Sequence, residues 1–359
     1  MISKDLNLRD FYQKVLQENQ PKEELFLQMG ELVFKVLSNN KPLILKLKSY
    51  FKEFIANKGE DHLTVVAIET SPLDYDEKSF KIKDPEPGKK KIKEEYFSNL
   101  SGQVVRKRLT NMMFFFGNDF HLGMGPCLEN DNQIINFINN RFLELRLNQG
   151  AQLGHAAAVF NPKTTKGMMF AGFSGAGKST LSLEVMKRGY SFLSNDRVLT
   201  RIEEEQVIME GIPKHPRINP GTIIHNEYLC RLIPEKERQK YLAMGDKLWD
   251  LEEKYDGLID QCFGEDKFKL INPCHFLIIL NWKRTKSPLE IKEVNIQERK
   301  DLLPAYMKQT GLFYLPSEAG KNIKRDESAY IEHLSKLEVF EFSGGVNFKE
   351  GADFCTSLL

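Results

Sequence analysis

Residues 172–179 carry the clearest chemical signal in the chain, because they read Gly-Phe-Ser-Gly-Ala-Gly-Lys-Ser and fit G-x-x-x-x-G-K-[ST] without a mismatch. A loop of this kind turns tightly and points backbone N–H groups at phosphate oxygens, since glycine has no Cβ. Its lysine is expected on the β- and γ-phosphates, and its serine hydroxyl on Mg²⁺. We therefore predict that the chain binds ATP and Mg²⁺ through Ser174, Gly175, Ala176, Gly177, Lys178, Ser179 and Thr180.

Two residues with acid–base character flank this loop. His155 precedes Lys178 by 23 positions, and Asp196 follows it by 18. Asp196 comes just after residues 190–193, which read as a short strand, and a carboxylate there is suited to hold the metal. A histidine near the acceptor would take its proton, although a lone histidine is also compatible with a packed structural role. We predict Ser179 and Asp196 as metal ligands, and Asp196, His155 and Lys178 as catalytic residues.

A loop rich in proline and cations follows at residues 211–221, which read Gly-Ile-Pro-Lys-His-Pro-Arg-Ile-Asn-Pro-Gly. Such a segment has neither a helical nor a strand pattern and is stiffened by its prolines. Arg217 is the best suited of its cations to clamp a phosphate, because the guanidinium fork binds oxyanions bidentately. We include Arg217 among the catalytic candidates, and a purely structural turn is the alternative.

The residues around these groups read as alternating strands and helices. The apolar run 168–171 predicts a buried strand before the loop, and residues 180–188 have helical spacing after it. These elements predict an α/β fold in which residues 150–359 form a P-loop nucleotide-binding kinase domain. The other expected elements are strands at 154–160, 190–193, 273–282 and 337–342, a hairpin at 198–208 and a helix at 296–308.

Residues 1–149 are predicted to form a separate N-terminal α+β region. We expect three helices within residues 5–56, paired strands at 104–125 and a helix at about 130–147. A strand at 63–68 is also expected. The charged segment 225–262 reads as helical, and we expect it to be a lid or a contact between copies in a homo-oligomer.

Composition excludes several classes of partner. Lys+Arg 51 against Asp+Glu 50 gives a net charge of +1, so no global attraction to nucleic acid or anionic membrane is expected. The 5 cysteines are widely spaced and odd in number, which argues against a disulfide framework. No stretch approaches the roughly 18–20 apolar residues of a spanning helix. We expect a cytoplasmic protein that uses intracellular ATP.

The motifs around the loop resemble a known family. His155 lies in a strand before the loop, Lys187-Arg188-Gly189 ends the helix, and Asn195-Asp196-Arg197-Val198 follows the next strand. Over about residues 150–220 this arrangement resembles the catalytic domain of the HPr serine kinase/phosphorylase family, and more distantly ATP-dependent phosphoenolpyruvate carboxykinase. The resemblance implies an HprK-related P-loop kinase that uses ATP and Mg²⁺.

The chain departs from that family at two places. Asn195 stands where the family has the first of two aspartates, the residue credited with taking the proton of the acceptor hydroxyl. An amide has no useful basicity near neutral pH, so Asp196, His155 or both must be the base, or the chemistry differs. The R-G-L-G signature linked to phosphorolysis has no clear counterpart either, which argues against a reverse reaction.

We therefore expect an enzyme that transfers the γ-phosphoryl group of ATP to a hydroxyl acceptor. The resemblance points to a serine of a partner protein, and a small-molecule alcohol fits the same chemistry. A carboxykinase-like reaction on a small acid is a second reading. A third, kept open by Asn195, is a regulatory module that senses ATP and transfers nothing.

Overall fold

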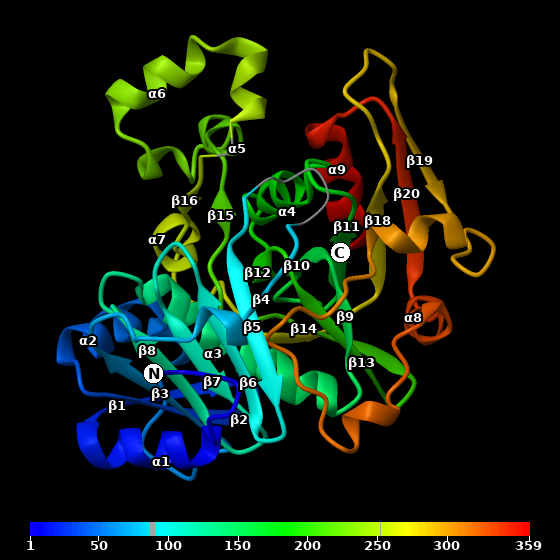
Figure 1. The fold of residues 1–359 in the computed structure, drawn as a ribbon. Helices are drawn as coiled ribbons and strands as arrows, with labels where there is room; N and C mark the ends of the chain where they lie inside the picture. The colour runs from blue at the N-terminus through cyan, green and yellow to red at the C-terminus, as the bar shows by residue number, and fades with distance from the viewer. Residues whose placement is uncertain (86–90, 252) are drawn as a thin grey trace. The chain divides into compact units, whose positions relative to one another are not determined.

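The computed structural model describes residues 1–85, 91–251 and 253–359. The chain forms two compact units, of which the first comprises Met1–Asn148 with Thr310–Lys321 and the second comprises Gln149–Gln309 with Asn322–Leu359. Each unit contains both helices and strands (Figure 1), and the α/β class expected from the sequence is confirmed. No helix of the described part of the chain is long and apolar enough to cross a membrane. The assignment of residues 150–359 as a kinase domain stays a prediction.

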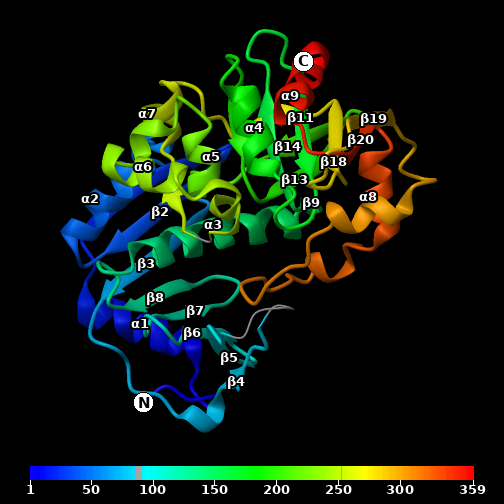
Figure 2. The same ribbon diagram turned by 90° about the horizontal axis from the view of Figure 1, so that it is seen from above.

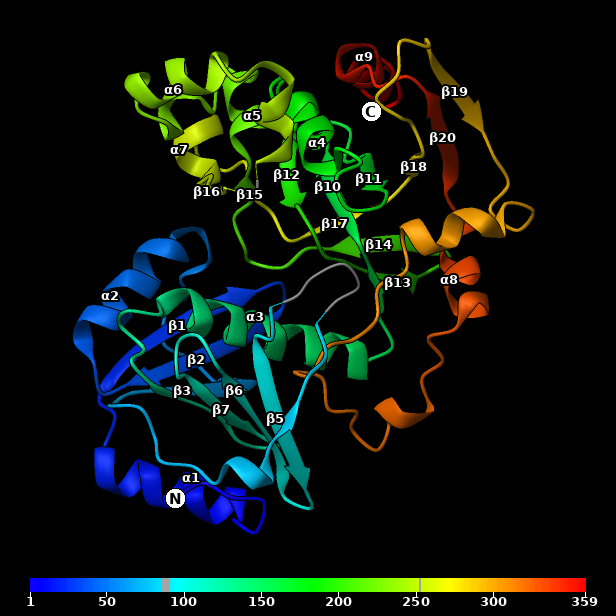
Figure 3. The same cartoon turned by 45° about the horizontal axis from the view of Figure 1, so that its top comes forward.

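The first unit is built on an eight-stranded sheet with the order β1-β2-β3-β8-β7-β6-β5-β4. Figures 2 and 3 show α1 on one face of this sheet and α2 and α3 on the other. The helices are α1 (Leu8–Asn19), α2 (Lys41–Tyr50) and α3 (Asp131–Asn148), with 3-10 turns η1 (Lys52–Phe54) and η2 (Glu77–Ser79). The strands are β1 (Glu23–Met29), β2 (Leu32–Ser38), β3 (Leu63–Glu69), β4 (Lys81–Ile82), β5 (Glu94–Asn99), β6 (Gly102–Lys107), β7 (Met113–Phe116) and β8 (His121–Gly125).

Both faces of β7 are buried, and its alternate side chains point to opposite faces of the sheet. Met113 and Phe115 join the cluster that includes Leu8 of α1. Phe114 points the other way and packs on Phe137 of α3, with ring centroids 4.8 Å apart. The expected strands and the helix at 130–147 are confirmed. The apolar run of β7 and the apolar face of α3 are the residues that pack between the sheet and its helices.

The prediction of three helices within residues 5–56 is wrong for the middle one. Residues 23–38 form an antiparallel hairpin in which Met29 pairs with Leu32 and Gly30 at the turn has a φ of 63°. Side chains of β2 alternate between buried and half-buried, as expected for a strand with one face on a core. The two flanking helices are real, and each begins at an asparagine cap, Asn7 for α1 and Asn40 for α2.

The second unit is built on a six-stranded sheet with the order β12-β10-β11-β18-β20-β19. Strand β18 runs parallel to both β11 and β20, so their carboxyl ends meet at one edge. Two smaller sheets have the orders β17-β14-β13-β9 and β15-β16. The strands are β9 (Gln152–Gly154), β10 (Ala156–Phe160), β11 (Gly167–Ala171), β12 (Ser191–Ser194), β13 (Val198–Glu203), β14 (Gln206–Glu210), β15 (Arg217–Ile218), β16 (Tyr255–Asp256), β17 (Ile271–Pro273), β18 (Phe276–Leu280), β19 (Leu289–Glu293) and β20 (Glu338–Gly344).

The helices of this unit are mostly short, and α4 packs along α9 (Figure 1). The expected strands, the 198–208 hairpin and the helix after the loop are confirmed. The helix expected at 296–308 is wrong: Pro304 lies inside it, and only a 3-10 turn forms there. The helices are α4 (Lys178–Met186), α5 (Pro220–Ile224), α6 (Glu235–Leu242), α7 (Ile259–Phe263), α8 (Glu327–Leu334) and α9 (Phe348–Leu358), and the 3-10 turns are η3 (Cys230–Leu232), η4 (Gly245–Asp250) and η5 (Lys300–Ala305). The 3-10 turn η6 (Gly320–Asn322) begins in the first unit and ends in the second.

Candidate nucleotide-binding site

The glycine loop joins the buried strand β11 to helix α4, as the sequence predicts. Gly175 and Gly177 have φ values of 82° and 93°, a left-handed conformation that favours glycine. A Cβ on Gly177 would also lie 2.7 Å from the ring of Phe348. Ser174 and Gly175 are exposed, whereas Ala176 and Gly177 are half-buried. The loop therefore has the backbone that a phosphate cradle requires.

An aromatic pair, Trp282 and Phe348, supports the loop. The indole Nε1–H of Trp282 donates to the carbonyl of Ala176 at 2.7 Å. Trp282 in turn meets Phe348 edge to face, with ring centroids 5.2 Å apart. These residues come from the segment after β18 and from the start of α9, so two distant parts of the sequence fix one loop. The end of the strand expected at 273–282 was predicted to approach the site, which Trp282 confirms, whereas no pattern in the sequence indicated Phe348.

Lys178 is held inside the loop. Its side chain is 8% exposed, and its ammonium group donates to the carbonyl oxygens of Gly172 at 2.7 Å and Phe173 at 3.3 Å. Burial lowers the pKa of Lys178 to about 8, while the charge of Asp196 raises it and that of Lys308 lowers it. An incoming phosphate would replace weak carbonyl partners with a full negative charge.

Asp196 lies at the centre of a charged cluster. Its Oδ1 is 3.3 Å from His155 Nε2, and its Oδ2 is 3.3 Å from Lys308 Nζ and 3.6 Å from Arg197 Nε. Partial burial raises the pKa of Asp196, but the hydrogen bond from His155 and the charges of Lys308 and Arg197 outweigh it. They hold this pKa well below its ordinary value. The structure thus brings together His155 and Asp196, the two residues that the sequence singled out, and adds Lys308.

Lys308 reaches the cluster on a segment that runs along the site. The carbonyl of Ala305 accepts from the N–H of Gly172 at 3.1 Å, and the N–H of Lys308 donates to Leu153 at 3.2 Å. The N–H of His155 donates to the carbonyl of Tyr306 at 2.6 Å. One stretch, residues 305–308, therefore contacts the start of the phosphate loop, the strand β9 and His155, which lies between β9 and β10.

The proline-rich loop contributes further cations. Burial, together with the charges of Arg197 and Arg217, lowers the pKa of Lys214 to about 8, while the charges of Asp196 and Asp256 oppose this shift. Arg217, at the start of β15, lies 3.4 Å from Asp256 across the small sheet, and both side chains are mostly exposed. Its predicted clamping role stays a prediction. The cations around Asp196 outnumber the carboxylates, so the region is suited to bind an anion.

Ser179 and Thr180 occupy the first turn of α4 and are half-buried. The Thr180 hydroxyl lies 2.8 Å from that of Thr222 on α5. The described residues include no group of three or more His, Cys, Asp or Glu side chains that could hold a metal. Ser179 and Asp196 nevertheless offer hard oxygen donors, which fits Mg²⁺, an ion usually held by one or two protein ligands and the phosphates of its substrate.

No family model matches the chain. A stretch of 113 residues, 30% of the chain, is 31% identical to the HPr kinase/phosphorylase of Geobacillus thermodenitrificans (strain NG80-2). The chain spans only 35% of the length of that relative. Part of this chain resembles HPr kinase/phosphorylase. The resemblance stated from the motifs is thereby confirmed for part of the chain.

A solved structure, the Hpr(Ser) kinase/phosphatase from Coxiella burnetii, matches 58% of this chain and 97% of its own at 16% identity. Its TM-score is 0.29, which is too low to carry an argument. Asn195, at the position of the family's first aspartate, has an enclosed Oδ1 without a hydrogen-bond partner among the described residues.

Proposed function

We propose that the protein is an ATP-dependent kinase that transfers the γ-phosphoryl group to a hydroxyl acceptor, a serine of a partner protein. The observation that carries this proposal is the set of cations around one carboxylate beside a phosphate loop: Lys178, Arg197, Lys214 and Lys308 with Asp196. Phosphoryl transfer passes through a loose transition state, so placing charge does most of the catalytic work. The part-length resemblance to an HPr kinase/phosphorylase supports a protein acceptor.

Each residue has a task in this proposal. The backbone N–H groups of residues 174–180 bind the phosphates, and Lys178 leaves its loop carbonyls for the β- and γ-phosphates. Ser179 and Asp196 would hold Mg²⁺, which would neutralise charge between the phosphates. Arg217 would clamp the γ-phosphate or an acidic part of the acceptor.

The charges around Asp196 separate the two candidates for the base. A carboxylate whose pKa lies well below its ordinary value binds a proton weakly and so makes a poor base. Such a carboxylate remains a good metal ligand and a good acceptor for the hydrogen bond from His155. We therefore assign proton transfer from the acceptor to His155, and metal binding and orientation of His155 to Asp196.

A module that binds ATP without transfer is the second candidate. It is favoured by Asn195, because an amide cannot take the proton of the acceptor hydroxyl as the first aspartate of the family's pair would. Both candidates require nucleotide binding at residues 174–180, so only a transfer assay separates them.

The test is incubation of the purified protein with γ-labelled ATP and lysate of its own cells. We expect a labelled protein band. Its label should withstand acid and be removed by alkali, as the label of a phosphoserine control is. Lys178→Ala is the matched control and should abolish labelling, because the charge on the β- and γ-phosphates is lost. Labelling of a small molecule would replace the protein acceptor, and equal labelling by Lys178→Ala would remove the proposal.

A further inference from the structure

Three neighbouring backbone segments of the second unit carry the charged cluster around Asp196. Gly154, the last residue of β9, pairs with Val198 of β13 on one side. On its other side Gly154 forms an antiparallel bridge to Met307. The segment 306–308 therefore lies along β9 as a further short strand would, and β9 lies between it and β13.

The members of the cluster follow from this pairing. His155 and Lys308 each come one position after a paired residue, and Asp196 comes two positions before one. The carboxylate of Asp196 lies 3.3 Å from His155 Nε2 and 3.3 Å from Lys308 Nζ. Sliding one segment by one residue would move its side chains by about 3.4 Å and turn them to the other face. The cluster therefore requires a fixed register.

Two backbone hydrogen bonds join the segment 306–308 to β9 and the residue after it. The N–H of Lys308 donates to the carbonyl of Leu153 at 3.2 Å, and the N–H of His155 donates to the carbonyl of Tyr306 at 2.6 Å. Backbone groups repeat along every strand, so such bonds hold two segments together without choosing one register. A side chain that contacts both segments can make that choice.

Tyr330 of α8 provides such a contact. Its hydroxyl donates to the carbonyl of Leu153 at 2.8 Å, and the same hydroxyl lies 3.4 Å from the carbonyl of Lys308. The side chain is 2% exposed, so water does not compete for these carbonyls. A carbonyl oxygen has two lone pairs, which allows Leu153 to accept from Tyr330 and from the backbone of Lys308 together. One buried hydroxyl thus contacts both segments.

Helix α8 holds this hydroxyl in place within the second unit. The side chain of Asp326 caps its first turn. His333 Nδ1 lies 3.1 Å from the hydroxyl of Thr200 on β13, which ties the end of the helix to the same small sheet. The rings of Tyr330 and Tyr306 meet edge to face with centroids 6.0 Å apart. The tyrosine therefore projects from a fixed helix and packs on the segment that it contacts.

We propose that Tyr330 is a positioning residue, which locks residues 306–308 against β9 and so holds Lys308 and His155 on the carboxylate of Asp196. The hydroxyl acts through backbone carbonyls and needs no contact with the phosphates or the acceptor. Its effect on turnover rests on the proposed function, whereas its effect on the backbone of residues 153–155 and 306–308 does not.

The test is Tyr330→Phe, which keeps the buried ring and removes only the hydroxyl. The carbonyl of Leu153 keeps its bond from Lys308, so the change leaves that carbonyl paired. The rate of transfer at saturating ATP should fall by about tenfold, because small misplacements of a charged group are costly in catalysis. The dissociation constant of ATP·Mg²⁺ should stay within about twofold, because the phosphate loop is unchanged. An unchanged rate would overturn the proposal.

Tyr190→Phe is the matched control within the second unit. Its hydroxyl also donates to a backbone carbonyl, that of Thr356, at 3.2 Å. Both variants lose one such bond, so their thermal unfolding midpoints should fall by similar amounts. Only Tyr330→Phe should slow transfer, whereas the control should keep the rate within about twofold. Equal loss of rate in the two variants would show that Tyr330 merely stabilises the fold.

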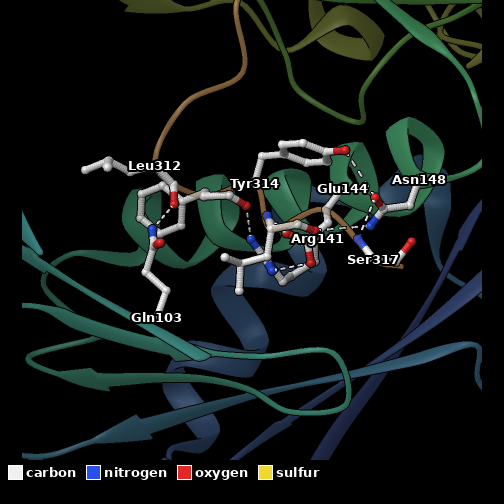
Figure 4. Close-up of polar contacts among 9 residues, drawn as sticks. Gln103, Arg141, Glu144, Asn148, Leu312, Tyr314 and Ser317 are labelled. Carbon is white, nitrogen blue, oxygen red and sulfur yellow. Dashed lines mark hydrogen bonds and ion pairs between the residues drawn. The ribbon is translucent and has the colours of Figure 1, made fainter. Parts of the chain in front are cut away.

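A second control concerns the segment that follows Lys308 in the sequence. Tyr314 lies six positions after Lys308 but belongs to the first unit, where its hydroxyl lies 3.2 Å from Asn148 Oδ1 (Figure 4). Tyr314→Phe should leave the rate within about twofold, because the proposed lock lies wholly in the second unit. A loss as large as that of Tyr330→Phe would overturn the assignment to Tyr330.

Lys308→Met tests whether the effect passes through this lysine. Adding Tyr330→Phe to Lys308→Met should lower the rate by a smaller factor than adding it to the wild-type protein, because part of what it misplaces is already absent. Full additivity of the two losses would contradict the positioning role.

Amide hydrogen exchange provides a readout that does not require transfer. The N–H groups of Lys308 and His155 should exchange about fivefold faster in Tyr330→Phe and at the wild-type rate in Tyr190→Phe. If the wild-type protein transfers no phosphate and this difference is present, the proposed function fails and the lock stands. If exchange in Tyr330→Phe matches the wild-type protein, the lock fails whatever the transfer assay shows.

Discussion

At the scale of single residues, the site depends on how one carboxylate is surrounded. Asp196 contacts an imidazole, an ammonium and a guanidinium, whereas the enclosed Oδ1 of its neighbour Asn195 has no hydrogen-bond partner among the described residues. Two adjacent positions with oxygen-bearing side chains therefore have different environments. Only Asp196 carries a charge, because an amide does not ionise near neutral pH, and the three cationic or imidazole groups around Asp196 favour that charge.

His155→Ala should lower the rate of transfer at saturating ATP by about 10²-fold, the usual scale for losing acid–base help. The dissociation constant of ATP·Mg²⁺ should hardly change, because the proposed role of His155 concerns the acceptor. Steady-state rates and calorimetric titration measure the two quantities separately. Lower thermal stability with unchanged turnover would show that His155 is a packing residue.

The lowered pKa values of Lys178 and Lys214 predict that the protein takes up protons when it binds nucleotide. Their pKa values of about 8 lie below the ordinary lysine value, so near pH 8 each lysine of the free protein is only partly charged. A bound polyphosphate favours the charged form and raises both pKa values, so binding at pH 8 should take up about one proton in total. Affinity should correspondingly fall as the pH rises through this range.

Calorimetric titration at pH 8 in two buffers of different ionisation enthalpy measures this uptake. Lys178→Met should remove about half of it, since that variant keeps only Lys214 as a titrating partner. Binding without proton uptake at pH 8 would contradict the placement of both lysines beside the phosphates.

At the scale of elements, the phosphate loop depends on the segments behind it. Trp282→Phe keeps the ring against Phe348 but removes the donor to the carbonyl of Ala176. Loss of one hydrogen bond of this kind costs about 1 kcal/mol, so ATP affinity should fall by roughly fivefold. Titration with ATP measures this effect, and Trp249→Phe is the control, because that tryptophan instead stacks on His225. Equal affinities in both variants would show that the loop keeps its shape without the indole.

Local elements could be predicted from the sequence, and distant contacts could not. The strand, loop and helix at 167–186 follow from a short apolar run, a glycine pattern and helical spacing within one window. The hairpin at 23–38 was misread because Glu, Leu and Gln are good helix formers, and only Gly30 and the alternation of β2 signalled a turn. Lys308 could not be found at all, since it lies 112 positions from Asp196 and in no motif.

At the scale of the whole molecule, the two units have separate hydrophobic cores. One buried cluster draws its members from residues 2–124, and another draws its members from residues 156–339. Residues 310–321 lie in the sequence between two parts of the second unit but belong to the first unit. Two cores in one chain predict two parts that unfold separately, and the second unit carries the phosphate loop.

ATP·Mg²⁺ should therefore stabilise the second unit and leave the first almost unchanged. A ligand that binds only the folded form stabilises it by about 2.7 kcal/mol at a hundred times its dissociation constant. Native-state hydrogen exchange resolves the two units, so protection should rise in β11, β18 and α4 but not in β3 and β7. Lys178→Ala should lose most of this gain. A gain of equal size in both units would instead mean that they unfold together, because a ligand on one unit can stabilise the other only when the two share a single cooperative transition.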